Sequence, residues 1–233
     1  WTGYSLLASP VILNSSARPP AQGPAQARDF NQDGGVPMQF YPFSAMLARM
    51  KYISRWGLMR SSRTESLCEH TADTALLAHT LALISVSIYG TQVRCETVCV
   101  AALYHDASEI LTGDMPTPVK YKTEPLRRAY KALERDAAAQ LATLAPHPAR
   151  RALAGYLTGD VLTEKERQLL KAADRLSALI KCIEEENTGN HEFTGAKAQQ
   201  TAALHAMQCP EAEYFLEHML PCYAWTLDEL SRE

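Results

Sequence analysis

The sequence has no hydrophobic run long enough to cross a membrane as a helix. Such a helix needs roughly 20 consecutive apolar residues, and the most apolar segment, residues 75–89, is interrupted by a histidine, a threonine and two serines. The sequence also lacks any long stretch in which apolar and polar residues alternate, the pattern of a half-buried strand. We therefore expect no membrane partner and a fold of the all-α class.

Cysteine motifs are missing as well, although the sequence contains six cysteines. No two of them form a Cys-x-x-Cys pair, and Cys95 and Cys99 are spaced to share one face of a helix. This usage is typical of reduced thiols in an intracellular protein. We therefore expect free cysteines and a cytoplasmic location.

The sequence also lacks an excess of positive charge. The chain has 23 Lys and Arg against 26 Asp and Glu, a formal net charge of −3. A general nucleic-acid binder needs a basic face, so we expect no nucleic-acid polymer as a partner. A small anionic substrate remains compatible, because a few local cations are enough to hold it.

The first 37 residues differ in composition from the rest of the chain. Residues 15–37, "SSARPPAQGPAQARDFNQDGGVP", are rich in Pro, Gln, Gly and Ala and show no periodic apolar face. We expect residues 1–37 to be a disordered or non-native N-terminal extension. Residues 38–233 are then one domain, and a hydrophobic content of 46% in the whole chain is enough to build its core.

From Phe43 onward, apolar residues recur at the spacing of a helix. A Thr-x-x-Glu capping box at Thr163 marks the start of one helix, and Gly113 marks the end of another. The pattern predicts a compact multi-helix bundle. Its helices begin near residue 43 and then cover residues 72–89, 95–111, 124–144, 163–186, 192–207 and 210–230.

Four side chains that could bind a metal stand out: His70, His105, Asp106 and Asp174. Asp174 lies in a mostly apolar helical stretch, where a buried carboxylate is costly unless a cation neutralises it. Two imidazoles and two carboxylates suit one divalent ion such as Co, Mn, Mg, Fe or Zn. On the residues alone, a surface role for Asp174 and a local hydrogen bond for the His-Asp pair remain alternatives.

Glu109 stands three residues after Asp106 and four after His105. Helical geometry would place these side chains on one face, one turn apart. From there Glu109 could accept a proton from a metal-bound water or orient that water.

The order His…His-Asp…Asp, in "EH", "YHDASE" and "ADRL", resembles the HD-domain metal-dependent phosphohydrolases. The longer segments "ISRWGLMRSSRTESLCEH" and "HDASEILTGDMPTPVKY" are similar to the bacterial 5′-deoxynucleotidases of that superfamily. The similarity runs from about Met38 to Leu230. It implies an all-helical homodimer that removes the phosphate of deoxyribonucleoside 5′-monophosphates.

The resemblance also implies a role for each matching residue. It makes His70, His105, Asp106 and Asp174 the metal ligands, and it makes Glu109, Arg55 and Asp114 catalytic. Trp56 would form a wall that excludes a ribose 2′-hydroxyl. The implied substrate-binding set is Arg55, Trp56, His70, Asp106, Asp114, Met115, Pro116, Thr117 and Asp174.

Several alternatives stay open at this point. Another HD-domain phosphohydrolase could act on cyclic nucleotides, dinucleotides or nucleoside triphosphates, and a non-enzymatic module could simply bind a nucleotide. The general base could be Glu109 or Asp114. Neither the physiological metal nor the preferred nucleobase follows from the residues.

Overall fold

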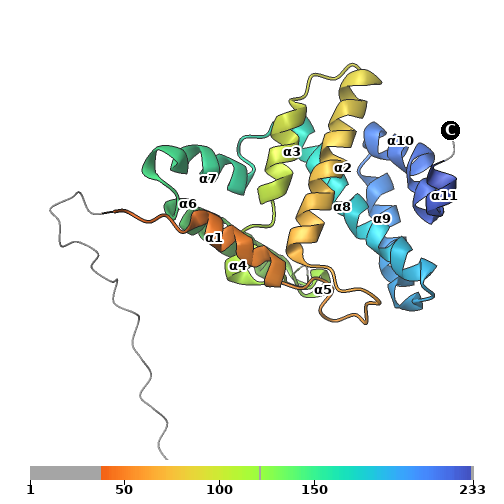
Figure 1. The fold of residues 1–233 in the computed structure, drawn as a ribbon, viewed down its shortest axis with the longest axis horizontal. Coiled ribbons are helices and arrows are strands. Elements are labelled where there is room, and N and C mark those ends of the chain that lie inside the picture. The colour runs from red at the N-terminus through yellow and green to blue at the C-terminus, as the bar shows by residue number, and fades with distance from the viewer. Residues whose placement is uncertain (1–37, 121, 232–233) are drawn as a thin grey trace, which may run out of the picture. The chain divides into compact units, whose positions relative to one another are not determined.

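Helices make up the regular structure of residues 38–120 and 122–231, the part of the chain that this computed structural model describes (Figure 1). In that part, extended pairing is limited to one isolated antiparallel bridge, between Ser54 and Ser66. The prediction of an all-α fold is therefore confirmed. No helix among these residues is both long and apolar enough to span a bilayer.

Phe40–Glu233 form one compact unit. The expected N-terminal extension, residues 1–37, lies outside the described residues, so its nature stays a prediction. The helices of the unit, in chain order, are α1 (Phe43–Leu47), η1 (Ala48–Tyr52), α2 (Leu67–Ser87), α3 (Cys95–Tyr104), α4 (Glu109–Thr112), α5 (Thr117–Lys120), α6 (Glu124–Thr143), η2 (His147–Ala149), α7 (Arg150–Thr158), α8 (Glu164–Asn187), η3 (His191–Phe193), α9 (Thr194–Ala206), α10 (Pro210–His218), η4 (Leu220–Ala224) and α11 (Leu227–Leu230).

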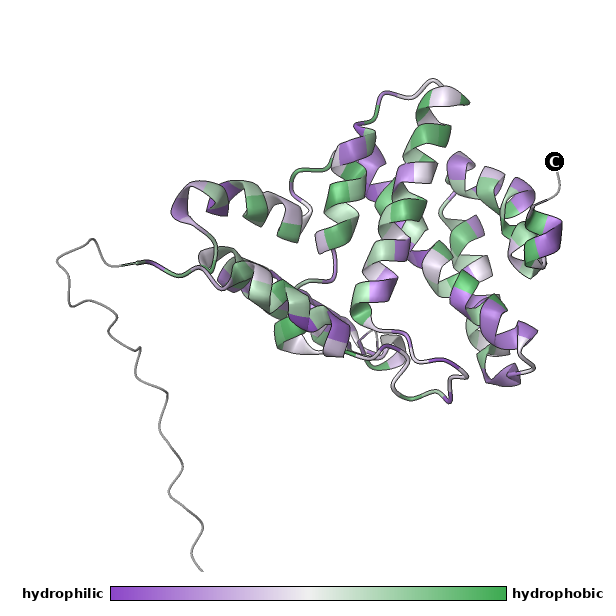
Figure 2. Ribbon diagram, in the orientation of Figure 1, coloured by the Kyte–Doolittle hydropathy of each residue, from purple (hydrophilic) through white to green (hydrophobic). Residues whose placement is uncertain are grey.

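Helices α2, α3 and α8 pack against one another at the centre of the unit. Leu81 of α2 and Leu169, Leu176 and Leu179 of α8 are almost completely buried in this main core. A second, smaller core lies where Phe43, Met50 and Leu67 meet residues of α6 and α7. Figure 2 shows the central helices α2 and α3 as largely hydrophobic, which agrees with their position.

Two long helices begin at capping boxes, and only one of these was predicted. The Thr163–Glu166 box begins α8 as expected. A second box pairs Ser66 with Glu69 at the start of α2. The Ser66 side chain accepts the backbone N–H of Glu69, and the Glu69 side chain accepts the backbone N–H of Ser66. Because Ser66 caps the helix, α2 begins at Leu67, five residues before the predicted start. This earlier start places His70 inside the first turn.

Two predicted helices are shorter or divided in the structure, and one observed helix was not predicted. The expected helix 95–111 ends at Tyr104, and a turn separates it from α4. The expected helix 210–230 is divided, because Pro221 disfavours helical geometry in the residue before it and cannot donate a backbone hydrogen bond. Helix α7 was not predicted, since the two prolines before it were interpreted only as a break.

Candidate metal centre and substrate site

Three separate elements bring the four suspected ligands to one point. His70 comes from the first turn of α2, His105 and Asp106 from the turn after α3, and Asp174 from the middle of α8. His70 Nε2 lies 3.2 Å from Asp174 Oδ1 and 3.5 Å from Asp106 Oδ2. His105 Nε2 lies 3.1 Å from Asp106 Oδ2 and 4.0 Å from Asp174 Oδ1. One donor atom from each of His70, His105 and Asp106 falls within 4.8 Å of the others.

The chemistry of these donors fits a divalent cation. The Nε2 atoms of His70 and His105 are both buried, and neither has a hydrogen-bond partner of good geometry. Their Nδ1 atoms are engaged elsewhere, 3.0 Å from Ser177 Oγ and 2.7 Å from the carbonyl oxygen of Ala102. That carbonyl accepts the Nδ1–H of His105, so Nε2 is the nitrogen left to bind an ion, as in protein metal sites.

The charges around the centre favour a cation there. Burial alone would lower the pKa of His105, but the carboxylates of Asp106 and Asp174 outweigh it and raise that pKa to about 9. Burial would raise the pKa of Asp106, but His105 and His70 hold it well below its usual value. Asp174 is less buried than its apolar surroundings in the sequence suggested, since 42% of its side chain is exposed.

Glu109 begins α4, one short turn beyond Asp106, and is 5% exposed. Its Oε2 atom is buried without a hydrogen-bond partner. Burial, and then the negative charges of Asp106 and Asp114, raise its pKa to about 9. With only the protein's own charges around it, this carboxyl group keeps its proton at neutral pH. Burial also raises the pKa of Asp114, which lies in the loop between α4 and α5.

Arg55 places a cation directly beside the suspected ligands. Its side chain is 13% exposed, with Nη1 3.6 Å from Asp106 Oδ2 and Nε 3.4 Å from Glu65 Oε1. Burial opposes its charge, but four carboxylates, beginning with Glu65 and Asp106, raise its pKa above the usual value. Arg55 therefore stays charged and offers a donor fork for an anion.

Trp56 has a left-handed backbone conformation, with φ of 59°. That conformation costs a bulky residue roughly 1–2 kcal/mol and is often associated with functional sites. The indole Nε1 donates to Glu65 Oε2 at 2.7 Å, and the ring packs edge-on against Phe193 at a centroid distance of 5.2 Å.

The structure thus groups most of the predicted residues into two sets. Direct contacts join the first set, which is Arg55, His70, His105, Asp106 and Asp174. The second set is Glu109 and Asp114, on which charges of the first set act. Met115, Pro116 and Thr117 continue the Asp114 loop into α5.

Sequence reasoning missed Glu65 and Ser177, which both approach the Nδ1 atom of His70. Ser177 could have been found, because it stands three residues after Asp174 and shares its helix face. Glu65 lies in a polar loop that carries no such periodic signal.

Solved structures of HD-domain phosphohydrolases have a similar fold. One from Listeria innocua matches with a TM-score of 0.68 and 24% sequence identity, over 78% of this chain and 87% of that one. A second, from cyanophage S-2L, was solved with bound dA and one catalytic Zn²⁺ ion. It matches with a TM-score of 0.57 and 20% identity, over 76% of this chain and 96% of that one. These likenesses define the fold as an HD-domain helical bundle.

The sequence comparisons identify the family. Residues 42–223 match the family described as 5′-deoxynucleotidase YfbR-like. The 5′-deoxynucleotidase YfbR of Escherichia coli is 42% identical over 191 residues, which are 82% of this chain and 96% of that protein. The chain therefore belongs to the YfbR-like 5′-deoxynucleotidase family, as its sequence resemblance suggested.

Proposed function

We propose that this protein is a metal-dependent phosphoric monoester hydrolase that converts deoxyribonucleoside 5′-monophosphates to deoxyribonucleosides and inorganic phosphate. The observation that carries the proposal is the convergence of two imidazole Nε2 atoms that make no hydrogen bond and two carboxylates beside a largely buried arginine. In the reaction, water adds to phosphorus, the bond from phosphorus to the 5′ oxygen breaks, and that oxygen leaves with a proton.

His70, His105, Asp106 and Asp174 would hold the divalent ion. A bound ion of this kind lowers the pKa of a coordinated water and polarises a phosphoryl oxygen. The ligand set admits Co, Mn, Mg, Fe or Zn, and the S-2L phage structure contains zinc. His70, Asp106 and Asp174 would thereby also lie against the substrate phosphate.

Glu109 is the residue that would move the proton. Burial and the charges of the protein alone raise its pKa to about 9, which keeps a proton on it at neutral pH, whereas a bound divalent cation would lower that pKa. A protonated Glu109 would give its proton to the departing 5′ oxygen, a role that needs an acid with a pKa near or above the working pH, and the proton that the attacking water loses would return to Glu109. Asp114, whose charge acts on Glu109, would orient the attacking water. Met115, Pro116 and Thr117 would line the nucleotide beside it.

Arg55 and Trp56 would recognise different parts of the substrate. Arg55 can bind the phosphate through its planar donor fork. The Trp56 ring would stand against C2′ of the sugar and exclude a hydroxyl group by clash.

The roles of Trp56 and Arg55 can be distinguished by one measured quantity, the deoxy-to-ribo ratio. This is kcat/KM on deoxyribonucleoside monophosphates divided by kcat/KM on ribonucleoside monophosphates. We expect Trp56→Ala to lower this ratio by about tenfold or more, because the added hydroxyl no longer meets a wall. Arg55→Ala should reduce both activities together by roughly a hundredfold and leave the ratio nearly unchanged, since both substrates carry the same phosphate. Equal losses on both sugars in Trp56→Ala would assign Trp56 to packing alone.

A phosphate-release assay tests the reaction itself. Chelator-treated protein is supplied in turn with each of the five metals and with deoxy- and ribonucleoside monophosphates, cyclic nucleotides, dinucleotides and nucleoside triphosphates. Release confined to monophosphates, with a deoxy preference and a metal requirement, is expected. Turnover confined to the other substrates would favour a different HD-domain phosphohydrolase, and nucleotide binding without turnover would favour a regulatory module.

The proposal extends to a cytoplasmic homodimer. All six cysteines are free, as expected for a reducing compartment. Leu76, Leu83 and Val86 fall on one face of α2 and are 70%, 45% and 41% exposed, an apolar surface of the kind that subunit interfaces use.

We expect Leu83→Glu combined with Leu76→Glu to convert the dimer to a monomer, because the interface would have to bury two charges. Light scattering measures the mass. Leu227→Glu is the matched control, because Leu227 is 78% exposed on α11 and lies outside this face. A monomeric wild-type protein would contradict the homodimer.

A further inference from the structure

The loop that carries Arg55 and Trp56 is closed at its base. Arg55 N–H donates to the carbonyl oxygen of Glu65 at 2.9 Å, and Leu67 N–H donates to that of Ile53 at 2.8 Å. Together with the Ser54–Ser66 bridge, these bonds hold the two ends of the loop side by side at the start of α2. Glu65 is therefore fixed next to Arg55 and Trp56, although nine residues separate it from Trp56 along the chain.

The carboxylate of Glu65 contacts three groups of the site. Its Oε2 accepts the indole N–H of Trp56 at 2.7 Å. Its Oε1 lies 3.4 Å from Arg55 Nε and 3.5 Å from His70 Nδ1. Only 11% of the Glu65 side chain is exposed, so water competes weakly for these contacts.

Trp56 depends on such a contact more than an ordinary tryptophan would. Its left-handed backbone is unfavourable for a bulky residue and persists only where the surroundings hold it. Phe193, which is fully buried, supports one edge of the indole ring. The contact with Phe193 alone still lets the Trp56 side chain rotate. The hydrogen bond to Glu65 is directional, so it restricts that rotation further.

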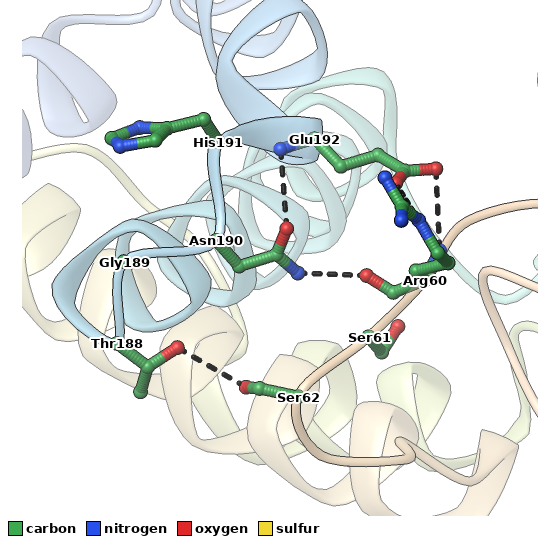
Figure 3. A pocket seen from close by; sticks show the side chains of 8 residues that line it. All are labelled: Arg60, Ser61, Ser62, Thr188, Gly189, Asn190, His191 and Glu192. Carbon is green, nitrogen blue, oxygen red and sulfur yellow. Dashed lines mark hydrogen bonds and ion pairs between the residues drawn. The ribbon is translucent and has the colours of Figure 1, made fainter.

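The far end of the loop is anchored by other residues. Buried Glu185 of α8 accepts Ser62 N–H at 2.7 Å. Arg60 pairs with Glu192 of η3, and Asn190 donates to the carbonyl oxygen of Arg60 at 2.7 Å (Figure 3). Because these contacts do not involve Glu65, its removal should leave the loop attached and affect Trp56, Arg55 and His70 locally.

We propose that Glu65 is a positioning residue that sets the sugar preference of the enzyme by fixing the Trp56 indole ring against the substrate. Through Arg55 and His70 it has a second effect, on the binding of phosphate and ion, which does not distinguish the two sugars. The inference rests on the proposed function, because it takes Trp56 as the wall at C2′.

Two substitutions separate the effects. Glu65→Gln keeps an oxygen that can accept the indole N–H but removes the charge beside Arg55. We expect it to lower kcat/KM on both sugars to a similar extent and to hold the deoxy-to-ribo ratio within about threefold. Glu65→Ala removes acceptor and charge together. We expect it to lower the ratio by about tenfold, the size of effect typical of one lost hydrogen bond to a charged group.

The indole N–H signal of Trp56 in an NMR spectrum tests the anchoring without any catalysis. Trp56→Phe assigns the signal, and the other two tryptophans, Trp1 and Trp225, serve as references. In Glu65→Ala the Trp56 signal should shift and exchange faster with water, whereas in Glu65→Gln it should stay protected. This result stands even if the wild-type protein releases no phosphate, which would count against the proposed function instead.

Glu192→Gln is the matched control, the same chemical change at a carboxylate that holds the same loop through Arg60. It should leave both the indole signal and the sugar ratio unchanged. The proposal would be overturned by a Glu65→Ala protein with wild-type ratio and protection, by a Glu65→Gln protein that loses the ratio, or by equal shifts in Glu192→Gln. If Glu65→Ala does not fold, the Glu65→Gln results still decide between support and rejection.

Discussion

Replacing Asp174 by alanine is expected to abolish metal binding and to reduce phosphate release by about a thousandfold or more. Asp174 is the one suspected ligand from α8, and its Oδ1 lies 3.2 Å and 4.0 Å from the two imidazole Nε2 atoms. A catalytic ion contributes several kcal/mol of transition-state stabilisation, and about 4 kcal/mol corresponds to a thousandfold in rate. The helical fold should persist, because the Asp174 carboxylate is partly exposed and α8 packs through its buried leucines.

Metal content after dialysis, circular dichroism and turnover measure the three parts of this result. Asp136→Ala is the matched control, since Asp136 is exposed on α6. It should bind one ion and turn over substrate like the wild type. An Asp174→Ala protein with normal activity and one bound ion would show that the metal centre is assigned to the wrong residues.

Glu109→Gln should have opposite effects on activity and stability. We expect it to reduce turnover by about a hundredfold to ten-thousandfold, the usual contribution of a general acid or base. In chelator-treated protein at pH 8, we also expect it to raise the free energy of unfolding by several kcal/mol, up to about 5 kcal/mol. The gain arises because the amide is neutral, whereas the wild-type carboxyl group must either keep its proton or bury a charge beside Asp106 and Asp114.

The sign of the pH dependence follows from the raised pKa. Between the usual glutamate value of 4.5 and about 9, the folded protein binds more protons at Glu109 than the unfolded chain does. Wild-type stability therefore falls as pH rises through this window. The Glu109→Gln protein lacks this loss, so the two stability curves should separate progressively from pH 5 to pH 9.

Denaturant unfolding in chelator at several pH values measures this separation. The control is Glu164→Gln, because Glu164 is an exposed residue in the first turn of α8. Its stability curve should run parallel to that of the wild type. Parallel curves for Glu109→Gln would show that Glu109 is ionised in the folded protein at neutral pH and cannot be the proton donor.

The sequence was sufficient for the features that depend on local pattern. Helical periodicity indicated the all-α class, and the Thr163 capping box located the start of α8, because both depend on residues within a turn or two of each other. The order of His70, His105, Asp106 and Asp174 indicated the family, and the structure brings these four side chains together.

Long-range contacts decided the rest. The apolar spacing of residues 95–111 runs through His105 without interruption, yet the helix stops at Tyr104, and the turn that follows brings His105 and Asp106 to the same centre as His70 of α2 and Asp174 of α8. Burial of Glu109, and hence its proton at neutral pH, depends on the elements around it and not on its neighbours in the chain.

Glu65 shows most clearly the difference between what local sequence pattern predicts and what long-range contacts decide. By sequence it is an acid in a polar loop, with no periodicity or motif to mark it. It meets Trp56 and Arg55 only because backbone bonds close the ends of that loop, and it meets His70 only because Ser66 begins α2 where it does. The sequence by itself determined the helical class, the position of several helices and which chemical groups are available. Only the tertiary structure decided which of those groups share one site, because such contacts join residues that no local pattern connects.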